Sequence, residues 1–87
     1  MEAVFNLTIM TPQAVLYEGR AASLVAPCAL GCLGVLANHA SLIATVEKGK
    51  IIVRSDSNER KVFYAEGRGF LEVLRNSVTL ILNNAGD

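Results

Sequence analysis

The stretch IIVRSDSNERKVFYA, residues 51–65, decides the fold class. β-branched and aromatic residues dominate its two ends, residues 51–54 and 62–65, and polar residues that favour turns fill its middle, residues 55–59. Side chains of the first kind favour strands, and a polar run between two such segments is typical of a hairpin loop. This stretch therefore predicts two antiparallel strands.

The same kind of segment recurs on both sides of the hairpin. Phe5, Leu7 and Ile9 alternate with the residues between them, which is the period of a strand with one face on a core. We expect Gly19 to interrupt one run and Pro27, which lacks an N–H, to end another. Further runs, divided by turn residues, lie at residues 14–17, 21–26, 31–36, 70–74 and 78–82, and residues 75–77 suit a tight turn. The pattern predicts an all-β fold of eight to ten short strands.

Residues 39–48 fit both a helix and a strand. Asn38 suits an N-cap, Gly49 suits a C-cap, and the apolar residues between them have helical spacing. However, residues 42–46 read LIATV, a β-rich run bounded by turn residues. The spacing of apolar residues does not decide between the two in so short a segment.

The length and composition are those of one small globular domain, which spans residues 1–87. Hydrophobic residues make up 52%, charged residues 18%, and the formal net charge is zero, which argues against a disordered chain and against nucleic-acid binding. The apolar content exceeds what one small core can hide. We therefore expect another protein to cover part of the surface.

The cysteines and the lengths of the apolar runs argue against a zinc site, a membrane-spanning segment and a secreted protein. No apolar run reaches the roughly 18 residues that span a bilayer, and the first residues do not resemble a signal peptide, so we expect a cytosol-like compartment. Cys28 and Cys32, with a single histidine elsewhere, are too few ligands for a four-ligand zinc site. Two buried or half-buried thiols are expected rather than a disulfide, and no metal.

No residue pattern indicates catalysis or a cofactor. His39 is the only side chain that ordinarily titrates near neutral pH, and a lone histidine without a neighbouring carboxylate favours a structural or interface role. The glycines near Lys50 and Arg68 lack the spacing of phosphate-binding loops. We expect neither an enzyme nor a nucleotide site.

Two alternatives remain open from the residues alone. Lys48 lies in the turn EKGK, residues 47–50, and small β-sandwiches can present such a lysine for lipoyl or biotinyl attachment. The flanking residues differ from both attachment signatures, so a solvated turn lysine is favoured. The second alternative is a free-standing β-sandwich that binds a partner.

Residues 31–42 read GCLGVLANHASL, similar to the pattern G-E-L-G-I-L-P-G-H-A-P-L. This pattern belongs to the N-terminal domain of the epsilon subunit of F-type ATP synthase, called delta in mitochondria. Residues 5–82 as a whole resemble that domain. The supporting stretches are LYEGR at 16–20, EKG at 47–49, GFLEV at 69–73 and NSVT at 76–79.

The chain also departs from the family pattern. Cys32 replaces a usual glutamate, Ala37 and Ser41 replace prolines, and Arg68 replaces a glycine. The sequence stops at Asp87, before the helical hairpin that follows this domain in longer family members. Either the subunit is naturally short or this sequence is a piece of a longer chain. As it stands, the chain should act without the hairpin's inhibitory or nucleotide-binding roles, and we expect residues 83–87 to be a frayed tail.

The resemblance implies a ten-stranded β-sandwich, or flattened barrel, in which residues 42–46 form a strand. It implies a noncatalytic central-stalk rotor subunit that couples ion translocation to ATP synthesis. Its partners would be the gamma subunit and the c subunits of the membrane rotor ring. The subunit would be peripheral, on the cytoplasmic face of the energy-transducing membrane, and held there only through the complex.

The resemblance also implies two contact sites. The first, around Thr11 and His39, would face gamma. The second, the turn at Gly31, Cys32 and Leu33, would face the rotor ring. Because Cys32 offers a small apolar group where the family has an acid, we expect contact with the ring to depend less on charge.

Overall fold

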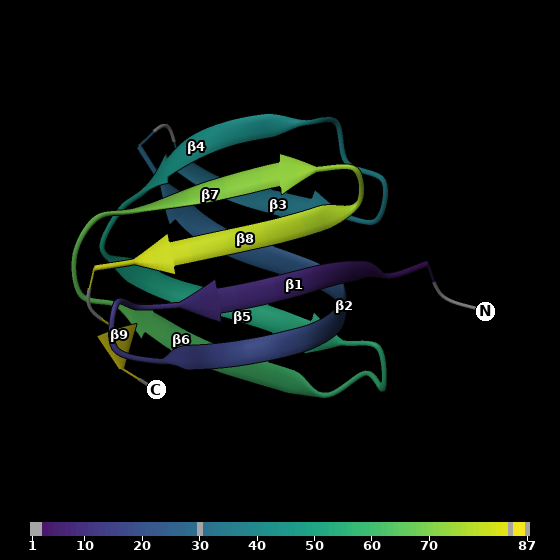
Figure 1. The fold of residues 1–87 in the computed structure, drawn as a ribbon, viewed down its shortest axis with the longest axis horizontal. Helices are drawn as coiled ribbons and strands as arrows, with labels where there is room; N and C mark the ends of the chain where they lie inside the picture. Colours follow the sequence, from purple (N-terminus) through teal and green to yellow (C-terminus); the bar gives the residue numbers. More distant parts are fainter. Residues whose placement is uncertain (1–2, 30, 84, 87) are drawn as a thin grey trace.

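Nine strands and no helix make up the described part of the computed structural model, residues 3–29, 31–83 and 85–86 (Figure 1). The all-β prediction is therefore confirmed. The strands are β1 Phe5–Met10, β2 Val15–Cys28, β3 Gly31–Leu36, β4 Leu42–Val46, β5 Gly49–Ser55, β6 Arg60–Ala65, β7 Gly69–Leu74, β8 Ser77–Leu82 and β9 Ala85–Gly86.

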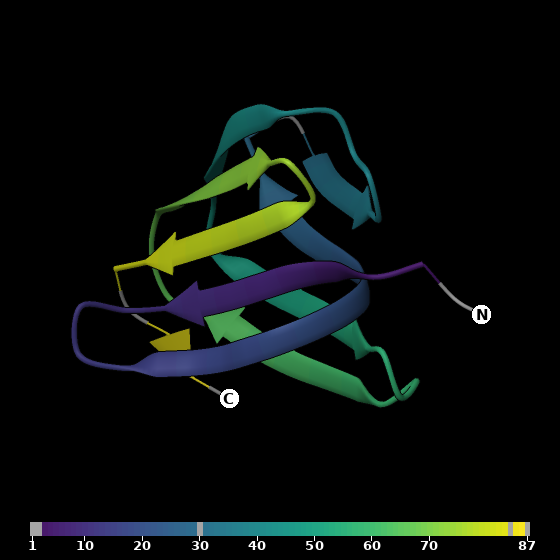
Figure 2. The same ribbon diagram turned by 45° about the vertical axis from the view of Figure 1, so that its right-hand side comes forward.

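The strands form two layers that share β2. The order along the hydrogen-bonded path is β1-β8-β7-β4-β2-β5-β6-β9; β3 also pairs with β2, and a β1–β2 pairing closes the sheet on itself. The first half of β2 pairs with β1 and its second half with β3 and β5, with an irregular register between Ala21 and Ser23. Figure 2 shows β2 curving from one layer into the other. The result is a flattened barrel measuring 35 × 23 × 20 Å.

The length of β2 corrects two expectations. The runs at residues 14–17 and 21–26 belong to one strand, because Gly19 pairs with Leu7 instead of starting a turn. Pro27 does not end the pairing, since it lies opposite Cys32 and its carbonyl accepts a hydrogen bond from the Glu47 N–H at 2.8 Å. A proline lacks only the donor, so it is tolerated near the end of a strand. Two of the expected strands are therefore one continuous strand.

Alternate side chains of the strands fill the space between the layers. Phe5, Leu7 and Ile9 of β1 are at most 1% exposed, and Ile51 and Val53 of β5 are fully buried. The predicted β5–β6 hairpin is confirmed, and its loop closes where the buried Ser55 Oγ accepts a hydrogen bond from the Glu59 N–H at 3.1 Å. The polar loop residues thus have a structural role.

Residues 42–46, for which the sequence pattern fits both a helix and a strand, form strand β4. Its residues pair with β7 in continuous register, from Leu42 opposite Val73 to Val46 opposite Gly69. Five backbone pairings with a neighbouring strand outweigh capping residues whose contribution is about 1 kcal/mol each. The strand that the resemblance implied is therefore confirmed, and the helix that the caps favoured is absent from residues 42–46.

Two residues near the C-terminus belong to the sheet. Ala85–Gly86 forms β9 and pairs with β6, where Gly86 lies opposite Tyr64. The expected frayed tail is therefore wrong for these two residues, because the outer edge of β6 offers them backbone partners. Asn84 and Asp87 lie outside the described residues.

Candidate interaction surface

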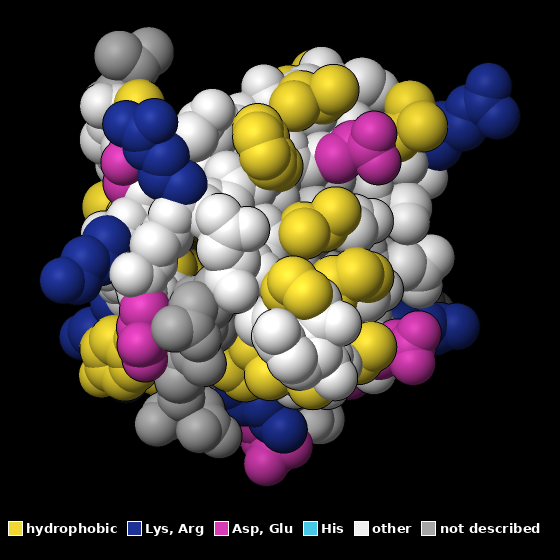
Figure 3. All heavy atoms as spheres, turned by 60° about the vertical axis from the view of Figure 1, so that its left-hand side comes forward, with side chains coloured by type: hydrophobic (Ala, Val, Ile, Leu, Met, Phe, Trp, Pro, Cys, Tyr) yellow, Lys and Arg dark blue, Asp and Glu magenta, His cyan; other side chains and the backbone are white. Residues whose placement is uncertain are grey.

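One outer face of the sandwich is apolar. Figure 3 shows hydrophobic side chains gathered over the layer formed by β4, β7, β8 and β1, with an acidic side chain among them. In a small domain, a contiguous apolar patch of this kind marks an interaction site. We call it the apolar face; it consists of Val15 (56% exposed), Ile43 (74%), Phe70 (60%), Leu74 (51%) and Ile81 (46%).

Strand register brings these residues together. Phe70 lies opposite Ile81, Ile81 opposite Met10, and Met10 opposite Val15, so one apolar row crosses four strands. Side chains directly opposite each other in neighbouring strands are in contact range. Residues from both ends of the sequence thus form one continuous surface.

These residues were not singled out in the sequence. A signal was present, because β7 reads GFLEVL and carries apolar residues on both faces instead of alternating. A strand with one solvated face should show polar residues at Phe70 and Leu74. The register that joins them to Ile81 and Val15 is not visible in the sequence.

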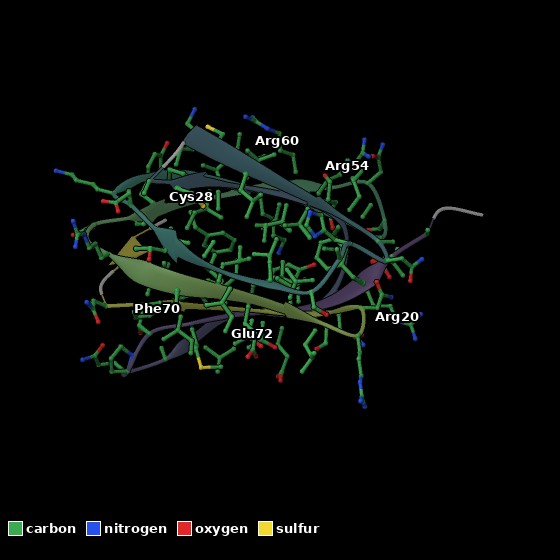
Figure 4. The ribbon with its side chains drawn as sticks, turned by 90° about the horizontal axis from the view of Figure 1, so that it is seen from above. Arg20, Cys28, Arg54, Arg60, Phe70 and Glu72 are labelled. Carbon is green, nitrogen blue, oxygen red and sulfur yellow. The ribbon has the colours of Figure 1, made fainter. Side chains whose placement is uncertain are left out.

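The two outer faces differ in charge. In Figure 4, Phe70 and Glu72 point away from the core on one layer, and Arg54 and Arg60 lie on the other. Lys50 is on the same side as these arginines, because it occupies the outward register of β5 with Arg54. The face that carries Glu72 is therefore the more apolar and the less basic.

Thr11 stabilises the turn between β1 and β2. Its N–H donates to the Ala14 carbonyl at 2.8 Å, and its Oγ1 accepts from the N–H groups of Gln13 and Ala14 at 3.3 and 3.2 Å. This turn follows Met10 directly. Thr11 therefore lies at one end of the apolar face.

His39 lies at the other end of the same layer. β1 and β4 run in the same direction, and Thr11 follows β1 whereas His39 precedes β4. The structure thus does not bring Thr11 and His39 together. The backbone N–H of His39 donates to the Leu36 carbonyl at 3.2 Å, and its ring Nδ1 donates to the Ala40 carbonyl at 2.8 Å. The imidazole ring is therefore hydrogen-bonded to the neighbouring residue of its own loop.

The loop of His39 is tied to the β7–β8 turn. The Asn38 N–H donates to Asn76 Oδ1 at 2.7 Å, and Asn76 Nδ2 donates to the Val4 carbonyl at 2.9 Å. Arg75 and Asn76 have φ values of 51° and 60°, as in the tight hairpin turn expected there. One side chain thus positions the loop that carries His39.

The Gly31, Cys32 and Leu33 turn lies at the same end of the molecule as Thr11. β2 reaches this end at Cys28, which pairs with Val46 at the end of β4. Gly31 and Cys32 are exposed, whereas Leu33 packs partly against the core. This part of the expected ring-facing site is therefore accessible.

Both cysteines are free thiols. Cys28 is half-buried as expected, but Cys32 is exposed. Burial raises the pKa of the Cys28 thiol, and the nearby Cys32 and Glu47 raise it further. Cys28 therefore remains protonated at neutral pH and is a weak nucleophile.

Lys48 and Arg68 lie on neighbouring turns at this end. Lys48 is exposed in the β4–β5 turn, and Arg68 Nε lies 3.6 Å from Glu47 Oε1. The arginine that replaces a family glycine thus has an acidic neighbour. Across residues 3–29, 31–83 and 85–86, no group of three or more His, Cys, Asp or Glu side chains is arranged to hold a metal ion, and no helix is long and apolar enough to cross a membrane.

A closed β-sandwich with an uncovered apolar face defines a domain of the kind that binds other proteins. The model of the family described as "ATP synthase, Delta/Epsilon chain, beta-sandwich domain" matches residues 4–86. The chain belongs to this family. This agrees with the resemblance inferred from residues 5–82. It disfavours the alternative in which Lys48 carries a lipoyl or biotinyl group.

Relatives and solved structures agree with the family. The chain is 34% identical over 85 residues to the ATP synthase epsilon chain of Dichelobacter nodosus, covering 98% of this chain and 59% of that one. It is 39% identical over 80 residues to the chloroplastic epsilon chain of Chlorella vulgaris, covering 92% and 58%. The chain thus spans under two thirds of the length of these relatives.

The fold is also that of a chain in a cryo-EM structure of the Euglena gracilis mitochondrial ATP synthase, described as OSCP/F1/c-ring. The TM-score is 0.89 at 20% identity, and the match covers 97% of this chain and 53% of that chain. A second match, at a TM-score of 0.80 and 16% identity, is in the Tetrahymena thermophila mitochondrial ATP synthase central stalk and c-ring, covering 94% and 65%. At these identities the similarity shows the fold.

Proposed function

We propose that this domain is a noncatalytic central-stalk subunit of an F-type ATP synthase. It binds the gamma subunit and the c subunits of the rotor ring, so that torque from ion translocation reaches the catalytic subunits. It is peripheral, on the cytoplasmic face of the energy-transducing membrane, and is held there through the complex. The family membership supports the assembly, and the apolar face is the observation that supports binding as the mechanism.

The apolar face is the surface for gamma. Its large side chains are about half to three-quarters exposed, and burying such side chains contributes about 25 cal/mol per Å² of apolar area. Thr11 and His39 lie at the two ends of this layer, about 20 Å apart along a six-residue strand. Thr11 follows β1 and His39 precedes β4, and β8 and β7 lie between these two strands. A partner that contacts both must therefore cross the layer diagonally, and we assign this path to gamma.

The exposed turn at Gly31, Cys32 and Leu33 faces the rotor ring. It lies at one end of the long axis of the barrel, so it can contact the ring while the apolar face contacts gamma. None of these three residues is charged. Shape and apolar contact therefore dominate this interface.

The decisive test is a charge on the apolar face. Phe70→Glu should lower affinity for purified gamma at least tenfold, because an unpaired carboxylate would be buried at the interface. Tyr64→Glu, on β6 of the opposite layer and 47% exposed, is the matched control and should bind normally. Binding is measured by titration, and folding of each variant by circular dichroism. Equal affinity of the folded Phe70→Glu variant and the control would contradict the proposal.

A further inference from the structure

One carboxylate lies within the apolar face. Glu72 is exposed on β7, between Phe70 and Leu74 on the same outer side of the strand, and it lies opposite Ile43 of β4. Figure 4 shows Glu72 pointing away from the core beside Phe70. Those three apolar side chains all belong to the apolar face. A partner that covers them therefore also covers Glu72.

The chain itself supplies no positive charge next to Glu72 on the neighbouring strands. Arg75, the nearest cation along the chain, lies beyond the end of β7 in the turn to β8. Within the described part of the chain, the Glu72 carboxylate has no hydrogen bond or ion pair. The outward residues opposite or diagonal to it on β4 and β8 are uncharged: Ile43, Thr45, Ser77, Thr79 and Ile81.

A hollow opens beside Glu72, where β4 begins and β7 ends. Its volume is about 250 Å³, and it is lined by Ser41, Leu42, Ile43, Glu72, Val73 and Leu74. This volume is below the roughly 300–1,000 Å³ of small-molecule sites, so the hollow suits one long side chain. Of these lining residues only Glu72 is charged, and the apolar ones can pack along an aliphatic stem. The hollow therefore favours a side chain with an apolar stem and a positive tip.

Covering Glu72 without a counter-charge is unfavourable. A carboxylate loses hydration when a partner buries the surface around it, and this loss is offset only if the partner supplies charge-assisted hydrogen bonds. Lysine and arginine combine a long apolar stem with a charged donor at its end.

We infer that a lysine or arginine side chain of gamma inserts into this hollow and pairs with the Glu72 carboxylate. The pair fixes how gamma is aligned on the apolar face, because apolar contact alone has no preferred direction. This inference rests on the proposed function and adds the chemistry of the partner residue.

Glu72→Leu separates an ion pair from general apolar contact. Leucine extends the apolar face, so a partner held by apolar area alone would bind this variant at least as tightly as the wild type. A cation in the hollow would instead lose its counter-charge, so affinity for purified gamma should fall at least about tenfold. Glu72→Gln keeps the shape of the side chain, removes its charge and should also weaken binding. Titration with gamma measures each affinity, and circular dichroism checks that each variant is folded.

Asp56→Asn is the matched control. It removes the same charge from an exposed position in the β5–β6 loop and should bind gamma normally. Normal binding of either folded Glu72 variant, or equal weakening by Asp56→Asn, would refute the pairing. The assignment of the apolar face to gamma would still stand if Phe70→Glu weakens binding. Failure of the wild-type chain to bind gamma, or normal binding of Phe70→Glu, would overturn both proposals.

Discussion

Asn76 joins three segments that are far apart in the sequence. Its side chain bonds the Asn38 N–H and the Val4 carbonyl, and its carbonyl accepts the Asn6 N–H at 3.1 Å. It also holds a left-handed conformation, with φ of 60°, that asparagine tolerates better than most residues. The contacts at this end of the sandwich therefore depend on one residue.

Replacing Asn76 by glycine separates these two contributions. Asn76→Gly keeps the left-handed backbone but removes both side-chain hydrogen bonds, so the free energy of unfolding should fall by about 1–3 kcal/mol. Urea denaturation measures the change. Asn58→Gly, at another left-handed position with φ of 67°, is the control and should have a much smaller effect. Equal effects of the two substitutions would contradict a bridging role.

His39 has a different role from Asn76, because its side chain bonds only the neighbouring Ala40 carbonyl among the contacts described. His39→Ala should weaken binding to gamma by roughly 1–2 kcal/mol and leave the isolated fold intact. Titration with gamma and thermal unfolding of the same preparations give the two quantities. Unchanged affinity together with lower stability would instead make His39 a structural residue.

At the scale of elements, β2 determines the architecture. Fourteen residues long, it pairs with β1, β3, β4 and β5 and takes part in both layers. Its end and the start of β3 carry the turn assigned to the rotor ring. The position of this turn therefore follows from the curvature of one strand.

The Cys32 turn leads to a prediction about salt. Cys32→Glu introduces the acid that the family resemblance implies at this position. Binding to the isolated rotor ring should then weaken more steeply with ionic strength than in the wild type, because salt screens exposed charge pairs. Ring binding at a series of salt concentrations measures the two slopes. Equal slopes would remove this turn from the interface.

At the scale of the whole molecule, two faces and one end have different properties. The apolar face, the cationic opposite face and the exposed end with Thr11 and the Cys32 turn suit simultaneous contact with more than one partner. A rigid barrel keeps these surfaces at fixed distances. The proposed transmission of torque between gamma and the ring would require such rigidity.

The 87-residue chain should bind no ATP and should not inhibit hydrolysis strongly. The turns near Lys50 and Arg68 lack the spacing of a phosphate-binding loop. The family resemblance implies that inhibition resides in a helical hairpin and not in the β-sandwich. Calorimetric titration with ATP and hydrolysis by complexes reconstituted with and without the chain measure the two properties. Millimolar or tighter binding, or strong inhibition, would place such a function on the sandwich itself.

The sequence alone determined the all-β class, the β5–β6 hairpin and the family, because alternation, turn residues and the GCLGVLANHASL motif are local. For residues 42–46 the local pattern left helix and strand open, the family resemblance implied a strand, and the structure confirms it. Tertiary structure alone decided that β2 continues through Gly19 and Pro27, and that Ala85–Gly86 pairs with β6. It also decided that Phe70, Ile81 and Val15 share one face while Thr11 and His39 lie at opposite ends. Pairing register depends on contacts between residues distant in the sequence, and local propensity does not encode them.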